Sequence, residues 1–454
     1  MKKSLVALAV LAATGAFAQS SVTLYGIVEA TADIGYNRTQ NGSTATTNTV
    51  VGAVPSVTSS TAATSSSQKN NFRVQDGSDQ GTGTSRVGFR GTEDLGGGMK
   101  ANFLLEMGLR IDDGCTTLTA TGGCDNGGNS LNSGGSTFGR NAWGGLSGGF
   151  GEVRVGRQVL GSYGVQANSE SSGAALGLYN SSSTFSLPIG GVRFSNAIRY
   201  MSPDFGGFKA SVMVAAPETG GNTASTGTAT TSASRRTGVD LALEYANGPA
   251  YIGFGYNKRD SANVTSSTTG VTTTNVSPGV ITAYTVGGSY DLGVVKPFIN
   301  YTRQTTDMSG STVAPAGTAS ATNSSNANAR ALSIGLRAPV GAFTVLAGFG
   351  RVNTTTNGMV TSTTGPGVTS TTASSDQVKR DAFQLGAQYA LSKRTLIEAN
   401  YGYSKVRSNG DASLSNGTFD ADGKVVSGAG NSATRSSNNN DRISAFNVGL
   451  KHSF

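Results

Sequence analysis

The last ten residues of the chain, AFNVGLKHSF, alternate strictly between two kinds of side chain. One set is Phe446, Val448, Leu450, His452 and Phe454, and the residues between them are small or polar. A period of two is the pattern of a β-strand with one apolar and one polar face. Because chain ends usually fray, alternation up to a terminal aromatic residue indicates that this last strand is paired with another strand.

Alternating segments of this kind recur along the chain, for example SRVGFRG (85–91), MKANFLLEM (99–107) and NAIRYMS (196–202). Gly, Pro, Asn and Asp residues, which favour tight turns, predict short connections at 92–98, 148–151, 202–207, 247–249, 291–294, 339–341 and 392–393. Polar tracts predict long segments at about 34–83, 111–136, 159–191, 217–236, 260–280, 305–328, 353–379 and 406–439. Seven short turns and eight long segments separate sixteen strands of roughly ten residues each, as in a membrane-spanning strand.

The composition shows where such strands can be stable. Charged residues make up 13% of the chain and apolar residues 36%, whereas soluble domains carry about 25% and about 45–50%. No window after residue 20 approaches the roughly 18–20 apolar residues of a membrane helix. A secreted adhesin or β-solenoid would show a repeat of fixed length, and we find none. The sequence therefore predicts an all-β, sixteen-stranded antiparallel transmembrane β-barrel with short periplasmic turns and long extracellular loops.

Two further features agree with export from the cytoplasm. Residues 1–18 combine Lys2 and Lys3, an apolar stretch and an Ala-Phe-Ala site, which is typical of a secretory signal peptide; residues 19–454 would form the barrel. Cys115 and Cys124 predict a disulfide within an external loop. Metal binding is the competing interpretation, but two thiols without a nearby His or third Cys make a poor zinc site.

Several blocks of sequence resemble the general porins of Gram-negative bacteria, in particular the β-proteobacterial trimeric porin family. They are SSVTLYGIVEA, TSRVGFRGTEDLGGGMKANFLLE, FGRNAWGGLSGGFGEVRVGRQ, AIRYMSPDFGGFKASV and the terminal FNVGLKHSF. The resemblance implies a homotrimer in the outer membrane, in contact with outer-membrane lipid and lipopolysaccharide. It also implies that the third long segment, about 159–191, folds inward and narrows the channel, and that Phe454 is a signal for the barrel-assembly machinery.

Candidate selectivity residues follow from the resemblance and from strand phase. The resemblance places Arg86, Arg140 and Arg193 in a basic cluster on the channel wall. Alternation turns Arg86 and Arg90 toward the lumen, since Val87 and Phe89 face outward, and Arg199 shares the phase of Arg193. Each arginine could also line the lumen without controlling ion flow.

Acidic residues on the inward segment would oppose such a basic wall. Segment 159–191 contains one acid, Glu170, and no base. Glu170 is therefore either the main local counter-charge or a solvated loop carboxylate. Arginines facing a nearly neutral loop predict a weak preference for anions.

The resulting hypothesis is a porin for passive diffusion of small hydrophilic solutes and ions. The alternatives are an adhesin or receptor that acts through its surface loops, and a substrate-specific channel. An enzyme is not expected, because the sole histidine, His452, lies in the apolar phase of the last strand, far from what a Ser-His-acid site requires. We expect no metal, no cofactor and no nucleic-acid partner, since zinc-ligand clusters, Walker motifs and compact basic-aromatic modules are missing from the sequence.

Overall fold

The structure is a computed structural model. It describes residues 21–51, 54–75, 85–109, 111, 114, 137–171, 192–217, 229–268, 272–312, 320–363, 369–419 and 425–454. The predicted signal peptide (1–18), Cys115, Cys124 and residues 172–191 of the third long segment therefore lie outside the described residues, and the disulfide stays a prediction.

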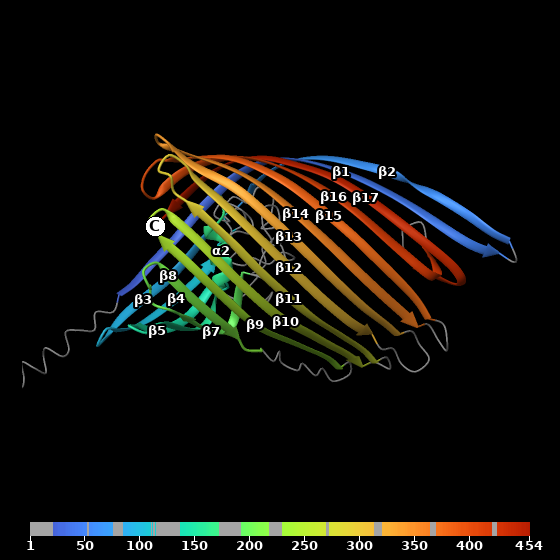
Figure 1. The fold of residues 1–454 in the computed structure, drawn as a ribbon, viewed down its shortest axis with the longest axis horizontal. Coiled ribbons are helices and arrows are strands. Elements are labelled where there is room, and N and C mark those ends of the chain that lie inside the picture. Colours follow the sequence, from blue (N-terminus) through green and yellow to red (C-terminus); the bar gives the residue numbers. More distant parts are fainter. Residues whose placement is uncertain are drawn as a thin grey trace, which may run out of the picture.

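Sixteen antiparallel strands close into a barrel in which neighbours in sequence are neighbours in the sheet (Figure 1). This confirms the predicted fold class. The strands are β1 (Ser21–Val51), β3 (Arg86–Gly96), β4 (Met99–Gly108), β5 (Asn141–Gly148), β6 (Gly151–Val159), β7 (Arg193–Met201), β8 (Phe208–Ala215), β9 (Ala229–Asn247), β10 (Ala250–Thr268), β11 (Thr272–Tyr290), β12 (Lys296–Thr312), β13 (Ser320–Val340), β14 (Phe343–Thr363), β15 (Thr369–Ala390), β16 (Thr395–Phe419) and β17 (Val425–Ser453).

The last strand closes the barrel against the first. β17 pairs with one edge of β1, beginning at Ile27 opposite Ser453. The terminal residue continues this ladder, because the Gly26 N–H donates to the Phe454 carbonyl (3.1 Å) and the Phe454 N–H donates to the Gly26 carbonyl (3.0 Å). The aromatic ring of Phe454 lies where a Cβ on Gly26 would stand. The expected pairing of the final strand is confirmed.

Segment 34–83, which we expected to be a loop, is largely strand, so that prediction was wrong. β1 runs on to Val51, and an additional strand, β2 (Val54–Gln75), returns along it. β3 occupies the Ser21–Ile27 part of the same edge of β1. β2 therefore extends the wall beyond β3 and does not add a seventeenth strand to the circumference.

The part of the wall that β9 to β17 form is also taller than expected. β3 to β8 have 8–11 residues, close to the predicted length, whereas β9 to β17 have 17–29. Much of the predicted loop sequence at 217–236, 260–280, 305–328, 353–379 and 406–439 therefore belongs to strands. A strand that leaves the bilayer needs no apolar face, so its polar sequence resembles a loop although its backbone remains paired.

The seven short turns lie where they were predicted, and Asp and Gly residues build several of them. The Asp94, Asp204 and Asp291 carboxylates accept hydrogen bonds from Gly96, Gly207 and Gly293 N–H groups at 2.9, 2.6 and 2.8 Å. Each of these glycines has a positive φ, which other residues adopt at a cost. The Gly207 N–H, followed by the Lys209 ammonium, holds the pKa of Asp204 below its usual value.

The barrel exposes apolar side chains and buries polar ones, the reverse of a soluble barrel. Val22, Leu24 and Ile198 are 65%, 54% and 59% exposed, whereas Asn257 and Thr302 are completely buried. Such a surface suits hydrocarbon outside and water inside. No helix among the described residues is long and apolar enough to cross a membrane.

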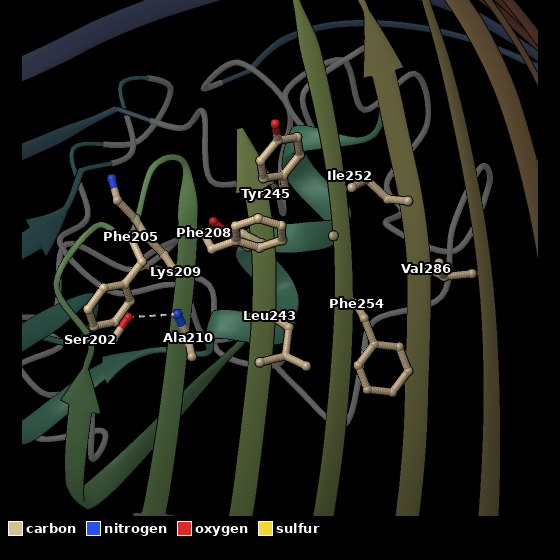
Figure 2. A pocket seen from close by; sticks show the side chains of 12 residues that line it. Ser202, Phe205, Phe208, Lys209, Ala210, Leu243, Tyr245, Ile252, Phe254 and Val286 are labelled. Atoms are coloured by element: carbon tan, nitrogen blue, oxygen red, sulfur yellow. Dashed lines mark hydrogen bonds between the residues drawn. The ribbon is translucent and has the colours of Figure 1, made fainter. Parts of the chain in front are cut away.

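Aromatic side chains gather on the outer surface near the short turns. Phe208 packs on Tyr245 with ring centroids 4.4 Å apart, and Phe343 packs on Tyr389 at 4.8 Å. Figure 2 shows Phe205, Phe208 and Tyr245 around an apolar groove that continues over β9 to β11. Aromatic rings of this kind mark the interface between lipid and water.

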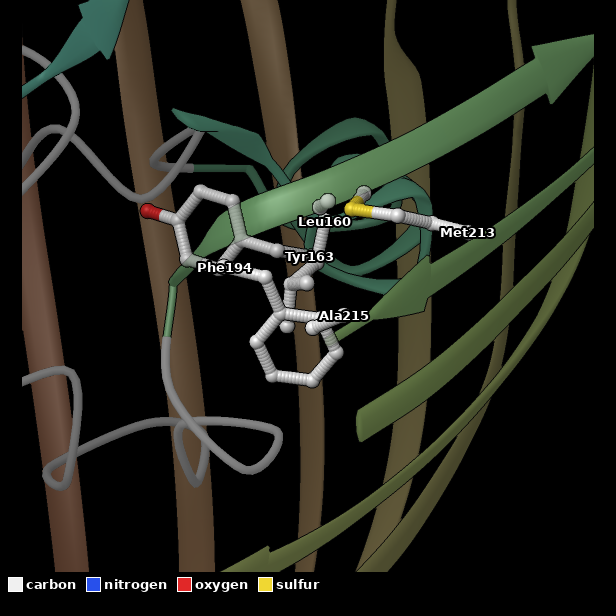
Figure 3. Close-up of a cluster of buried hydrophobic side chains, with 6 residues drawn as sticks. Leu160, Tyr163, Phe194, Met213 and Ala215 are labelled. Carbon is white, nitrogen blue, oxygen red and sulfur yellow. The ribbon is translucent and has the colours of Figure 1, made fainter. Parts of the chain in front are cut away.

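The first part of the third long segment lies inside the barrel. It contains the helix α2 (Gly161–Asn168). Leu160 and Tyr163 of this segment pack on Phe194, Met213 and Ala215 of the wall (Figure 3). This cluster fixes the point at which the segment turns inward.

From there the segment follows the inner wall across several strands. Glycines lie beneath it: a Cβ on Gly253 would come within 2.7 Å of Val165, and one on Gly255 within 2.7 Å of Ser162. Further along, the Asn300 side-chain amide donates to the Ser169 hydroxyl (2.7 Å). The described part of the segment therefore lies flat against β9 to β13, and glycines on the wall make room for it.

Asp240 on β9 holds the start of α2 against the wall. Its carboxylate accepts hydrogen bonds from the Gly161 N–H (2.7 Å), the Ser162 N–H (3.2 Å) and the Ser162 hydroxyl.

Asp240→Ala should lower the free energy of unfolding by about 2–3 kcal/mol, because buried donors lose a charged acceptor. It should also increase open-channel current noise, since α2 is released. Urea unfolding and single-channel recording measure both effects, with Glu93→Gln on the exposed part of β3 as the control; unchanged noise would contradict the anchoring role.

Candidate functional site

Three of the predicted arginines come together on one side of the barrel. Arg86 lies on β3, Arg140 directly precedes β5, and Arg193 opens β7. Arg140 interacts electrostatically with both Arg86 and Arg193. Like-charged guanidiniums gathered on one side of the wall produce a positive field across the adjacent lumen.

Arg157 adds a fourth guanidinium to this group. From sequence it shares the phase of Val153 and Val155, so only an irregular strand would bring it to the cluster. The ladder between β6 and β7 is irregular at this point, between Gly156 and Gln158. Arg157 donates to the Gly139 carbonyl (2.7 Å) and the Ser195 hydroxyl (2.6 Å), and it interacts electrostatically with Arg193.

Glu106 on β4 is the carboxylate at the centre of the cluster. Its Oε1 pairs with Arg140 Nε at 2.9 Å, and the two side chains are only 7% and 3% exposed. The Asn141 amide donates to the same oxygen (3.2 Å), and the Tyr25 hydroxyl donates to Oε2 (2.8 Å). A buried ion pair with this many additional hydrogen bonds is held in one geometry, so Arg140 is fixed to the wall and largely neutralised.

Tyr25 reaches Glu106 by crossing the neighbouring strand over Gly88. The register places Tyr25 opposite Gly88 and Gly88 opposite Glu106. A Cβ on Gly88 would lie 2.7 Å from atoms of the tyrosine ring. Arg90, two residues further on, lies over the same ring with its Cζ 5.4 Å from the centroid. Gly88 is therefore required by the close approach of the ring.

The remaining two candidates lie elsewhere. Arg199 lies between β7 and the α2 segment, where it donates to the Val159 carbonyl and the Ser211 hydroxyl, both at 3.1 Å. Glu170 lies at the end of the described inward segment and is 6% exposed. It borders a small cavity together with Ser333 of β13 and Gln384 of β15, far around the wall from β4.

Comparison with known proteins identifies the family. A family model described as Gram-negative porin matches residues 4–409. The chain belongs to this porin family. It is 30% identical to an outer membrane porin protein of Bordetella pertussis over 439 residues, which cover 89% of this chain and 94% of that protein. It is also 38% identical to Outer membrane porin protein 32 of Delftia acidovorans over 218 residues, 46% of this chain and 48% of the relative, so that match spans about half of the relative's length.

A solved structure has the same fold. The anion-selective porin from Comamonas acidovorans superposes with a TM-score of 0.50 and 24% identity, covering 96% of this chain and 100% of that one. This likeness shows the fold alone. The family and the barrel together place the protein in the outer membrane of a Gram-negative bacterium as a porin channel.

Sequence reasoning missed two of the porin's site residues and undervalued a third. Glu106 has the right strand phase, but nothing in the sequence places it beside Arg140. Tyr25 and Gly88 were not singled out. Aligning the first two strands in register could have found them, because a tyrosine in the polar phase opposite a glycine has room to lie across its neighbour.

The contact between Tyr25 and Gly88 predicts a non-additive pair of substitutions. Gly88→Ala should destabilise the porin by about 1–3 kcal/mol, because the new methyl group displaces the ring. In a Tyr25→Ala background the same change should cost much less, since the ring is gone. Free energies of unfolding in urea for the four variants of the cycle give the coupling. Gly144→Ala, whose Cβ would meet nothing closer than 3.9 Å, is the control, and additive costs would refute the proposed overlap.

Proposed function

We propose that the porin is an anion-preferring channel through which small hydrophilic solutes and ions diffuse passively. The observation that supports this most directly is the gathering of Arg86, Arg140, Arg157 and Arg193 on one side of the wall, where Glu106 is the carboxylate that the described residues place beside Arg140. Selectivity in such channels depends on the charges at the narrow part of the lumen. Since Glu106 offsets the charge of Arg140, the preference for anions would come mainly from the other three arginines.

The inward segment would form the opposite boundary of the narrow region. Its described part, up to Ser171, lies against the wall and offers one carboxylate, Glu170, beside β13 and β15. Arg199 and Asp240 hold this segment in place and would act on ion flow only through its position. We therefore assign Arg199 a positioning role and Glu170 a weak opposing charge.

Assembly and export complete the proposal. We infer that residues 1–18 are removed on export, that Phe454 is read by the barrel-assembly machinery, and that three copies associate in contact with membrane lipid. Support for the trimer comes from membership of the family. The pairing of Phe454 with Gly26 supports a role of the terminal residue in closing the barrel. The same family and fold favour a channel over an enzyme.

The tall outer part of the wall supports a second role at the cell surface. β1 and β2 pair as far as Val51 opposite Val54, well beyond the part of β1 that meets β3. A long paired hairpin is a suitable platform for adhesion or for recognition by another cell or particle. Removing residues 43–66 should abolish such binding while conductance changes little, because the seam between β1 and β17 below it is kept.

The selectivity proposal is tested by the reversal potential in a salt gradient across a planar bilayer. Wild-type protein should prefer anions, and Arg86→Gln with Arg193→Gln should lower the anion-to-cation permeability ratio severalfold, toward unity. The wild-type preference should also weaken between 0.1 M and 1 M salt, since the screening length falls from about 10 Å to about 3 Å. Lys258→Gln, an exposed cation on the outer face of β10, is the control. A cation preference in the wild type would overturn the proposal.

A further inference from the structure

The only tryptophan of the chain, Trp143 on β5, faces the lumen. Tryptophans of membrane barrels usually lie on the outside, in the aromatic girdles where lipid meets water. Trp143 has the opposite strand phase to Leu146, which is exposed on the outer surface, and its own side chain is partly exposed. A large apolar ring is therefore presented to the water-filled channel.

Arg154 on β6 fixes this ring in place. Its guanidinium lies over the Trp143 ring, with Cζ 4.0 Å from the ring centroid. The Glu152 carboxylate accepts hydrogen bonds from Arg154 Nε (2.9 Å) and Nη2 (2.8 Å). A bidentate pair of this kind fixes the plane of the guanidinium, so the ring and the guanidinium form a rigid stack. Because Glu152 also offsets the charge of Arg154, the stack is an aromatic surface with little net charge.

The strand register places Arg90 and Leu104 beside Trp143 in one row across the wall. Arg90 on β3 lies opposite Leu104 on β4, and Leu104 lies opposite Trp143. The preceding residues in the sequence, Phe89 and Phe103, are exposed on the outer surface, so Arg90 and Leu104 face inward. Neighbouring strands lie about 4.8 Å apart. A guanidinium, an apolar side chain and an aromatic ring therefore follow one another along roughly 10 Å of the lumen wall.

Arg90 keeps its positive charge at one end of this row. It is exposed, and its guanidinium lies over the Tyr25 ring. Within the described part of the chain no carboxylate forms an ion pair with it, whereas Arg140 and Arg154 each have such a partner. The row lies one step closer to the short turns than the row that contains Glu106. An unneutralised cation therefore lies beside an apolar surface, next to the arginine cluster.

From this arrangement we propose that Arg90, Leu104 and Trp143 form a binding subsite for small aromatic carboxylates. The inference rests on the proposed channel function and names a class of solute for it. A solute such as benzoate would place its carboxylate on the Arg90 guanidinium, which suits bidentate pairing. Its ring would lie against Leu104 and the stacked Trp143. An aliphatic carboxylate can make only the first of these contacts, and a neutral aromatic solute only the second.

The test is titration of the purified, folded porin with benzoate, followed by the fluorescence of its single tryptophan. Benzoate should give a saturable change at concentrations at least about tenfold lower than acetate, which lacks the ring, or benzyl alcohol, which lacks the charge. Arg90→Gln should weaken benzoate binding about tenfold, because a charged hydrogen-bond donor is lost, and Arg90→Lys should weaken it less. Lys209→Gln removes an exposed cation on β8 and is the control, with unchanged affinity.

The role of the ring is measured by equilibrium dialysis with radiolabelled benzoate, since variants of Trp143 lack the fluorescent reporter. Trp143→Leu should weaken binding about threefold to tenfold, in line with the contribution of an aromatic pair. Trp143→Phe keeps a ring at the site and should retain most of the affinity. Phe254→Leu removes an aromatic ring from the outer surface and should have no effect.

Equal affinity for benzoate and acetate, a fluorescence change that does not saturate, or unchanged benzoate affinity in both Arg90→Gln and Trp143→Leu would each overturn the proposal. The reversal potential in a chloride gradient tests the channel function separately. Anion preference without benzoate binding would remove the subsite alone. Saturable benzoate binding in a channel that prefers cations would support the subsite and overturn the proposed selectivity.

Discussion

Every backbone N–H and C=O group inside a bilayer must be paired within the protein, and this requirement dictates the closure of the sheet. The chain meets it by joining β17 to β1 from Ile27 upward and by pairing Phe454 with Gly26. Once the sheet is closed, alternate residues of each strand are assigned to lipid or to the lumen. The exposed valines and leucines, the buried amides and the inward phase of Arg86 follow from that closure, whereas the position of Arg157 also depends on the irregular ladder between β6 and β7.

Inside the barrel, charge is used in two different ways. Arg140 is fixed by its ion pair with Glu106, whose carboxylate also accepts hydrogen bonds from Asn141 and Tyr25, so the position of Arg140 is set and part of its charge is offset. Arg86 and Arg193 interact with this fixed group and Arg157 interacts with Arg193, and these three would supply most of the field in the proposed channel. Glycines complete the arrangement by removing side chains where other parts must lie close, at Gly88 beneath Tyr25 and at Gly255 beneath Ser162.

On the outside of the barrel, the kind of side chain changes with height along the strands. Aromatic pairs such as Phe343 with Tyr389 mark the short-turn end, and a row that includes Phe349 and Phe383 marks the other edge. Beyond this row the strands β9 to β17 continue into a tall, polar wall. At this boundary the requirement for an apolar face ends, and charged residues such as Arg351 and Arg407 become possible on the outside.

The sequence by itself determined the fold class, the short turns and the inward phase of Arg86 and Arg90, because a period of two and turn-forming residues are local signals. It did not reveal the true height of the wall: once both faces of a strand meet water, alternation disappears, so β2 and the outer parts of β9 to β17 resembled loops. Only the tertiary structure joined Tyr25 and Glu106 with Arg140, placed Arg199 behind α2, and aligned Arg351, Asp381 and Lys405 across three strands. Those relations depend on register between strands, which is set by the closure of the whole sheet and leaves no trace in any single strand.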